Sequence, residues 1–143
     1  MLITHQKAPG EETLRALLRE HGLSPTVQRV AIARFVLGSA DHPTAEDVFM
    51  GVREGLDGVS QATVYNTLNR LVECRIINQF QRTGERVRYD GNTTPHHHFF
   101  DVEEGTLHDL DQALVAIELD PALLEHVEAS DVRVVIEGRR RKD

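Results

Sequence analysis

The sequence predicts an α+β protein in which an N-terminal winged helix-turn-helix domain precedes a small α/β dimerisation domain. Three observations lead to this fold class. Apolar residues recur at helical spacing in four segments before Arg75, the spacing changes to the alternation of strands near Ile77, and the acidic excess is confined to the chain beyond Asp90. We therefore expect one domain over residues 1–90 and a second over residues 91–143.

The first two predicted helices occupy residues 12–21 and 27–37. The leucines of ETLRALLRE recur at helical spacing in the first, and Gly22 suits the position after its end. The triplet SPT at residues 24–26 is a typical helix start, and the apolar face that follows it extends to Gly38.

The third and fourth predicted helices begin at polar capping residues. Thr44 precedes the third, with Asp47 three residues later in a capping-box arrangement, and either Gly55 or Gly58 ends it. Ser60 begins the fourth helix, SQATVYNTLNRLVECRII, whose apolar residues again recur at the helical period.

A hairpin follows the fourth helix. Residues 77–81 and 86–90 alternate as two short strands around a turn at Thr83 and Gly84. Three short helices followed by a longer helix and a hairpin predict a winged helix-turn-helix. A generic small α+β domain without a ligand is the alternative that this pattern leaves open.

The second part of the chain reads as strands with short helices. We expect strands over residues 96–102, 106–110 and 132–136, and helices over residues 114–117 and 122–127. An open three-stranded sheet of this size leaves edges and part of its core exposed. Dimerisation through this part would cover them.

Composition restricts the compartment. The 143-residue chain carries 16 Lys and Arg against 23 Asp and Glu, a formal net charge of −7. It has no run of about 18 apolar residues, as a transmembrane helix requires, and its N-terminus does not read as a secretory signal. A single cysteine, Cys74, excludes an intramolecular disulfide and a zinc site of several cysteines. We expect a soluble cytoplasmic protein with no membrane partner.

The charge is unevenly distributed. Residues 1–90 hold 11 basic and 11 acidic side chains, whereas residues 91–143 hold 5 and 12. As a whole, an acidic chain disfavours a nucleic-acid partner, because such proteins usually present a basic surface. The neutral first part nevertheless remains compatible with DNA binding, and the acidic second part with a bound cation.

The helix that Ser60 begins is the candidate recognition helix, because the second helix of this motif reads base edges in the major groove. Its Gln and Asn suit adenine, and its Ser, Thr and Tyr suit phosphates or base edges. Arg82, Arg86 and Arg88 put basic charge on the hairpin, as a wing along DNA requires. A merely solvated polar face is the alternative. The predicted DNA contacts are Arg19, Arg29, Ser60, Gln61, Thr63, Tyr65, Asn66 and Arg70.

Histidines and carboxylates form a second cluster. On a strand His96 and His98 point to one face and His97 to the other, so the first two can share an ion. Asp109 lies across the expected hairpin, and Asp90 ends the wing. Two imidazoles and two carboxylates suit Fe(II), Mn(II) or Zn(II). A solvated histidine run in an acidic segment is the alternative.

Four motifs in order, GLSPTVQRV, HPTAEDVF, SQATVYNTLNRL and the histidine-rich strand, resemble the ferric uptake regulator (Fur) family from about Leu14 to Gly138. The resemblance implies a metal-dependent transcriptional repressor without enzymatic activity. It also implies a homodimer whose two winged helices bind a palindromic double-stranded DNA operator.

Within that family, the peroxide-sensing PerR branch has a regulatory metal pattern that matches His42, Asp90, His96, His98 and Asp109. The resemblance implies Fe(II) or Mn(II) at this site, with Zn(II) a further candidate in purified protein. It also implies that peroxide reacting at bound Fe(II) oxidises a histidine ligand, His42 or His96, and that the damaged site releases DNA.

The sequence departs from the family in lacking the paired CxxC motifs of its structural zinc site. We expect the dimerisation domain to be stabilised by packing alone, and Cys74 to pack as a small apolar group. The HHH triplet resembles the Irr branch, which also lacks those cysteines and is associated with haem, so His97 is an additional candidate ligand. The alternatives are therefore a haem-responsive iron regulator and, in another class, a mononuclear non-haem iron enzyme.

Overall fold

The structure, a computed structural model, describes residues 7–142. The chain divides into two compact units with their boundary between Thr93 and Thr94. Within the described residues, no helix combines the length and the apolar character needed to span a membrane.

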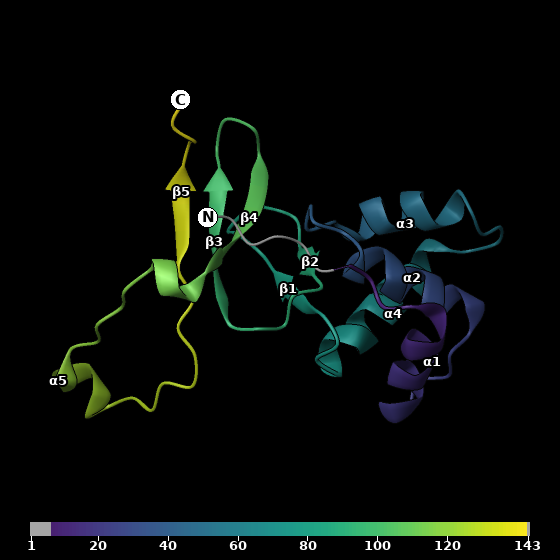
Figure 1. The fold of residues 1–143 in the computed structure, drawn as a ribbon, viewed down its shortest axis with the longest axis horizontal. Helices are drawn as coiled ribbons and strands as arrows, with labels where there is room; N and C mark the ends of the chain where they lie inside the picture. The colour runs from purple at the N-terminus through teal and green to yellow at the C-terminus, as the bar shows by residue number, and fades with distance from the viewer. Residues whose placement is uncertain (1–6, 143) are drawn as a thin grey trace. The chain divides into compact units, whose positions relative to one another are not determined.

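The N-terminal unit contains the four predicted helices and the predicted hairpin (Figure 1). Helices α1 to α4 pack together, and the strands β1 and β2 form the wing. Each helix agrees with its expected range to within a few residues, and the strands are shorter than expected. Their bounds are α1 Glu11–Glu20, α2 Val27–Leu37, α3 Ala45–Arg53, α4 Gln61–Glu73, β1 Asn78–Phe80 and β2 Arg88–Asp90.

The polar residues expected at three helix starts act as caps. The Thr26 hydroxyl accepts a hydrogen bond from an amide of the first turn of α2, and Ser60 does the same for α4. Thr44 and Asp47 form a reciprocal capping box, in which each side chain accepts from the other residue's amide at 3.2 and 3.0 Å. Such caps each stabilise a helix by about 1 kcal/mol, so these local side chains favour the observed helix starts.

One apolar core holds the N-terminal unit together. Each fully buried aliphatic side chain contributes about 1.5–3 kcal/mol relative to an exposed one. Tyr89 of β2 is 3% exposed and joins this core, so the wing is anchored to the helices. The fully buried aliphatic residues are Leu14, Leu18, Ile32, Val36, Val48, Val64, Leu68, Leu71 and Ile77.

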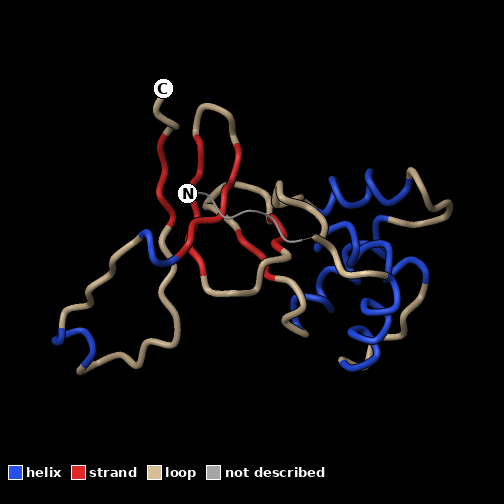
Figure 2. The backbone as a smooth tube through the Cα atoms, viewed as in Figure 1, coloured by secondary structure: helices blue, strands red, loops and turns tan. Residues whose placement is uncertain are grey.

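The C-terminal unit is built on a three-stranded sheet of order β4-β3-β5 (Figure 1). Strand β3 pairs antiparallel with β4 and parallel with β5. A long connection, mostly loop in Figure 2, runs from β4 to β5 and carries the 3₁₀ helix η1 and the short helix α5. The bounds are β3 His96–Asp101, β4 Thr106–Asp111, η1 Gln112–Leu114, α5 Pro121–Leu124 and β5 Val135–Gly138.

The predictions for this connection were partly wrong. The helix expected over residues 114–117 is a single 3₁₀ turn that ends at Leu114, and α5 has only four residues. Leu114, Ile117 and Leu124 are each at least 41% exposed in the single chain, so no buried face extends either helix.

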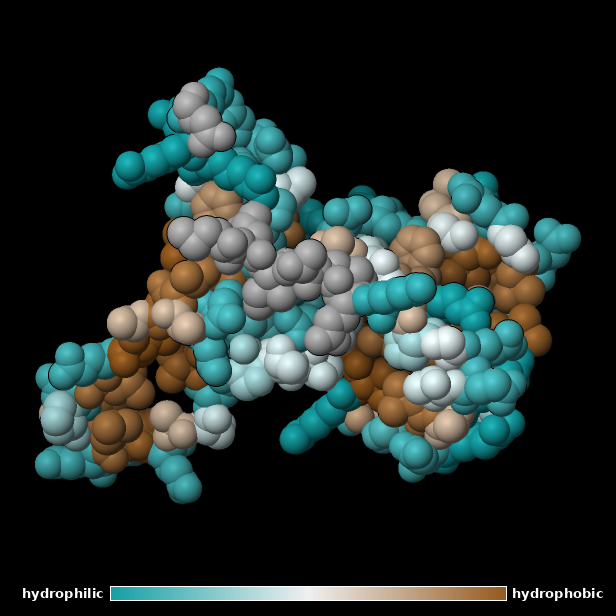
Figure 3. All heavy atoms as spheres, viewed as in Figure 1, coloured by the Kyte–Doolittle hydropathy of each residue, from teal (hydrophilic) through white to brown (hydrophobic). Residues whose placement is uncertain are grey.

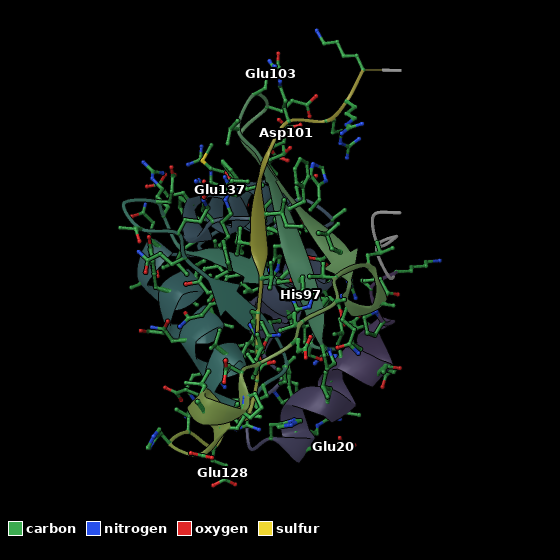
Figure 4. All side chains as sticks on the ribbon, turned by 90° about the vertical axis from the view of Figure 1, so that its left-hand side faces the viewer. Glu20, His97, Asp101, Glu103, Glu128 and Glu137 are labelled. Carbon is green, nitrogen blue, oxygen red and sulfur yellow. The ribbon has the colours of Figure 1, made fainter. Side chains whose placement is uncertain are left out.

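A buried carboxylate stabilises the turn at one end of the sheet. Asp101, at the end of β3, is 2% exposed and accepts hydrogen bonds from the amides of Glu103 and Glu104 at 3.0 and 3.1 Å. Figure 4 shows Asp101 and Glu103 near the same end of the sheet. The structure thus adds a polar contact to the packing that we expected to act alone in this unit.

The environment of Asp101 shifts its acidity. Burial by itself would raise the pKa of this carboxyl, but the amides of Glu104, Glu103 and Arg140, together with the charge of the Arg140 guanidinium, hold the pKa below its ordinary value. Because Arg140 follows β5, this ionised group links the end of the chain to the β3–β4 turn.

We predict that Asp101→Asn lowers the melting temperature at neutral pH and that this difference shrinks in acid. A folded-state pKa below the ordinary value means that ionised Asp101 stabilises the fold above about pH 4, and that this contribution is lost as the pH falls through the folded pKa. Melting curves from pH 7 to pH 3 test this. Glu104→Gln, an equal charge change at an exposed side chain of the same turn, is the control; equal shifts for both variants would contradict the prediction.

Candidate metal centre

Strand alternation assembles three ligand atoms in the C-terminal unit. His96 and His98 point to one face of β3, and their Nε2 atoms lie 3.2 Å apart. Asp109 of β4 stands directly opposite His98 in the strand register. Its Oδ1 lies 3.2 Å from Nε2 of His96 and 3.5 Å from Nε2 of His98. The expected pairing across this hairpin brings these three side chains together.

A backbone contact fixes the ring of His96. Its Nδ1 lies 2.6 Å from the carbonyl oxygen of Thr94. A carbonyl oxygen only accepts hydrogen bonds, so Nδ1 must carry the proton and donate it. In the neutral imidazole this leaves the lone pair on Nε2, the atom that faces His98 and Asp109. Metal-binding histidines are usually oriented by such a contact.

His97 lies on the opposite face of β3 from its two neighbours. Its Nδ1 accepts a hydrogen bond from the amide of Val134 at 3.1 Å, and the amide of His98 donates to the Val134 carbonyl at 3.0 Å. Both polar backbone groups of Val134 are therefore taken by the histidine strand (Figure 4 labels His97). The pairing of β5 with β3 continues from Val135, so the last strand lies later than the expected residues 132–136.

The N-terminal unit holds the other two predicted ligands. His42 Nε2 lies 3.4 Å from Asp90 Oδ2, and both side chains are buried. The other oxygen of Asp90 accepts the amide of Asn92 at 2.8 Å. His42 has φ +50°, a left-handed conformation that is uncommon for residues with a side chain, and such strain concentrates at functional sites.

The donor set suits a borderline divalent ion. His96, His98 and Asp109 supply two nitrogens and one oxygen, and His42 with Asp90 supplies one of each. Imidazole with carboxylate is the ligand type of Fe(II), Mn(II) and Zn(II) sites, and no thiolate is involved. The chemistry of the residues present therefore fits the metals that the sequence predicts.

The predicted DNA contacts lie on three helices of the N-terminal unit, α1, α2 and α4, with Ser60 as the cap of α4. Of the eight residues, Arg29, Thr63, Asn66 and Arg70 line one hollow of about 470 Å³ between the start of α2 and α4. Arg70 also pairs with Glu73 at 3.0 Å. Four others lie outside this hollow: Arg19 is exposed on α1, and Ser60, Gln61 and Tyr65 are exposed at the start of α4.

The three wing arginines make contacts that sequence reasoning missed. Arg82 pairs with Glu85 at 3.7 Å, and Arg86 pairs with Glu46 of α3. Arg88 donates from Nη1 to the carbonyl oxygen of His42 at 3.4 Å. Nothing in the sequence around Arg88 indicates a partner 46 residues away, so only the fold reveals that it contacts the loop that contains His42.

The sequence is similar to that of known proteins over much of its length. A sequence profile of the Ferric uptake regulator family matches residues 20–137. The peroxide-responsive repressor PerR of Staphylococcus aureus (strain Mu50 / ATCC 700699) is 34% identical over 88 residues, which make up 62% of this chain and 59% of the relative. The chain thus matches less than two thirds of the length of that curated relative.

Solved structures share the architecture. A zinc-bound manganese uptake regulator is 27% identical with a TM-score of 0.67, and the match covers 90% of this chain and 99% of that one. The ferric uptake regulator of Pseudomonas aeruginosa with manganese is 22% identical with a TM-score of 0.65, over 90% and 98%. PerR of Streptococcus pyogenes is 23% identical with a TM-score of 0.53, over 98% and 97%.

These likenesses confirm the predicted fold class, an N-terminal winged-helix domain followed by a C-terminal dimerisation domain. The family profile covers most of the chain, including α4 and β3. The chain therefore belongs to the ferric uptake regulator family, as the resemblance of its motifs predicted.

Proposed function

We propose that this protein is a cytoplasmic, metal-dependent transcriptional repressor that binds DNA as a homodimer and responds to peroxide. The observation that carries the proposal is the pair of groups formed by four buried residues and the partly buried Asp109: His96, His98 and Asp109 in one unit and His42 with Asp90 in the other. The name of the Staphylococcus aureus relative, a peroxide-responsive repressor, supports the choice of signal.

The proposed regulatory ion is Fe(II) or Mn(II), with Zn(II) a substitute in purified protein. It would take His96, His98 and Asp109 from the C-terminal unit and His42 and Asp90 from the N-terminal unit. When bound, the ion supplies positive charge that offsets the carboxylates and, as Fe(II), reactivity toward peroxide. If the ion needs ligands from both units, metal binding favours one arrangement of the two units. Metal binding and DNA binding are then coupled wherever DNA also favours that arrangement.

The proposed DNA contacts follow the winged-helix geometry. Ser60 caps α4, and Gln61, Thr63, Tyr65 and Asn66 occupy its first turns, the part of a recognition helix that reaches base edges. The remaining proposed contacts, to phosphates, are Arg19, Arg29 and Arg70, and their loss should weaken binding about equally on all DNA sequences. A homodimer would place two such helices on the half-sites of a palindromic operator.

Exposed apolar side chains support dimerisation through the C-terminal unit. Figure 3 shows hydrophobic residues gathered over the connection that carries α5. A surface of this kind is typical of an interface with another protein chain. The exposed apolar residues here are Leu114, Ile117, Leu123, Leu124, Val127, Val132 and Ile136.

The proposed signal is an irreversible change of a histidine. Hydrogen peroxide transfers one oxygen atom to a ring carbon of His42 or His96, the ring C–H becomes C–OH, and the peroxide is reduced to water. An oxidised ring is a poorer ligand, so the metal site and the DNA complex weaken together. The proposal assigns His97 no part in this chemistry, because it lies on the opposite face of β3 from His96 and His98 and its Nδ1 accepts the Val134 amide.

We predict that Asp109→Asn weakens Mn(II)-dependent DNA binding. Residues that merely orient ligands cost 10–100-fold in metal affinity when replaced, so losing a ligand should cost at least about tenfold. Anisotropy of labelled DNA from upstream of the protein's own gene, titrated with Mn(II) without oxygen, measures this. Glu104→Gln removes the same charge from an exposed site in the β3–β4 turn, outside the proposed dimer surface, and should match wild type. Equal Mn(II) requirements for wild type and Asp109→Asn would remove Asp109 from the site.

We predict that peroxide added to the Fe(II) form, and not to the Mn(II) form, adds one oxygen atom to the peptide containing His42 or His96. Peptide mass spectrometry and loss of DNA binding in the same samples test this. Unmodified peptides together with a strong Soret band on haem titration would contradict peroxide sensing and favour the haem-responsive alternative.

We predict that Leu124→Glu shifts the protein from dimer to monomer, because it places a charge in the exposed apolar surface around α5. Analytical ultracentrifugation of the metal-loaded protein gives the mass directly. Val102→Glu is the matched control, since Val102 is 55% exposed in the β3–β4 turn and lies outside that surface. A dimer of unchanged stability for Leu124→Glu would rule out this surface.

A further inference from the structure

The loop that carries His42 is joined to the wing strand by main-chain contacts. The amide of Tyr89 donates to the carbonyl oxygen of Pro43 at 2.9 Å. Thr44 and Arg88 form an isolated antiparallel bridge. Pro43 and Thr44 therefore pair with β2 through an isolated bridge, and this loop–wing seam lies wholly within the N-terminal unit.

Both ends of His42 contact β2. Its carbonyl oxygen receives the Arg88 guanidinium at 3.4 Å, and its Nε2 faces the Asp90 carboxylate at 3.4 Å. Arg88 and Asp90 are two residues apart on the strand and so share a face, whereas Tyr89 between them is buried in the core. One three-residue strand thus presents a cation to the backbone of His42 and an anion to its ring.

His42 needs such support because its backbone is strained. At φ +50° a residue with a Cβ is in a sparsely populated region, which persists only when surrounding contacts compensate for it. The Arg88 contact is one of these contacts, and it touches neither Nε2 of His42 nor the proposed ion. Arg88 is half-buried and directed to this loop, unlike Arg86, whose side chain is 71% exposed.

We propose that Arg88 is a positioning residue for the metal site, holding the strained His42 loop on the wing strand so that His42 and Asp90 are prearranged for the ion. This inference deepens the proposed function and rests on it. It differs from the expectation that Arg88 serves the wing as a contact to DNA phosphates. Preorganisation raises affinity by removing an ordering cost from binding, so Arg88 acts on metal affinity before any DNA is present.

The test is Mn(II) binding by full-length metal-free protein without DNA, measured by competition with a fluorescent chelator. Arg88→Gln should lower Mn(II) affinity about tenfold, within the range known for residues that orient ligands. Arg88→Lys, which keeps the charge and loses the fork of donors, should fall between Arg88→Gln and wild type. Arg86→Gln, the matched control on the same hairpin, should bind Mn(II) as wild type does.

Two further measurements separate the alternatives. Hydrogen exchange of metal-free protein should show faster exchange at the Tyr89 amide in Arg88→Gln than in wild type, with equal protection in α1 as the check on folding. At saturating Mn(II), DNA affinity and its salt dependence should be unchanged. Wild-type Mn(II) affinity in Arg88→Gln, with weaker DNA binding and a salt slope reduced by about one, would overturn the inference and make Arg88 a phosphate contact.

Failure of the proposed function gives a different result. If wild-type protein binds no Mn(II), or binds DNA equally with and without it, metal-gated repression is wrong whatever the Arg88 variants do. If wild type behaves as proposed and Arg88→Gln equals wild type in Mn(II) affinity and in Tyr89 exchange, only the role of Arg88 is wrong.

Discussion

The register between β3 and β4 is the constraint on which the candidate metal centre depends. With His98 opposite Asp109, two imidazoles and one carboxylate share a face and their ligand atoms converge to within 3.5 Å. A slip of one residue would turn His97 to that face and remove His96 and His98 from it, since strand side chains alternate. The opposite face is also in use, because His97 holds Val134 and thereby sets where β5 begins. The strand pairing of β3 therefore determines both which side chains share the metal-facing side and where β5 joins the sheet.

In the N-terminal unit, ligand position is linked to backbone conformation. The capping box at Thr44 fixes the start of α3. Directly before it, the carbonyl of Pro43 accepts a hydrogen bond from Tyr89 of β2. His42 takes up this turn with a positive φ that its contacts to Arg88 and Asp90 support. The proposed ligand His42 is thus held by side-chain contacts to the same short strand that forms the wing, beside the main-chain contacts of Pro43 and Thr44.

Much of this could be predicted from the sequence, for a physical reason. Helix caps and strand alternation are local, so Thr44, Asp47 and Ser60 marked helix starts correctly, and His96 and His98 were correctly placed on one face. Features set by contacts between distant residues could not be predicted. The contact from Arg88 to His42 and that from Val134 to His97 each join segments more than 30 residues apart. The helix expected over residues 114–117 was wrong because its apolar pattern has no core within the single chain to pack against.

In the C-terminal unit, the Asp101 carboxylate holds the end of the sheet through hydrogen bonds from backbone amides, without any sulfur ligand. Residues 94–143 contain no cysteine, and Cys74 lies in the other unit. Oxidants attack thiolates readily, and chelators extract metal from thiolate clamps, but neither reagent acts on a carboxylate held by backbone amides. The scaffold of this unit therefore offers no thiolate to the reagent that its histidines are proposed to detect. Oxidation of a histidine ring would therefore leave in place the Asp101 contacts that hold the end of this sheet.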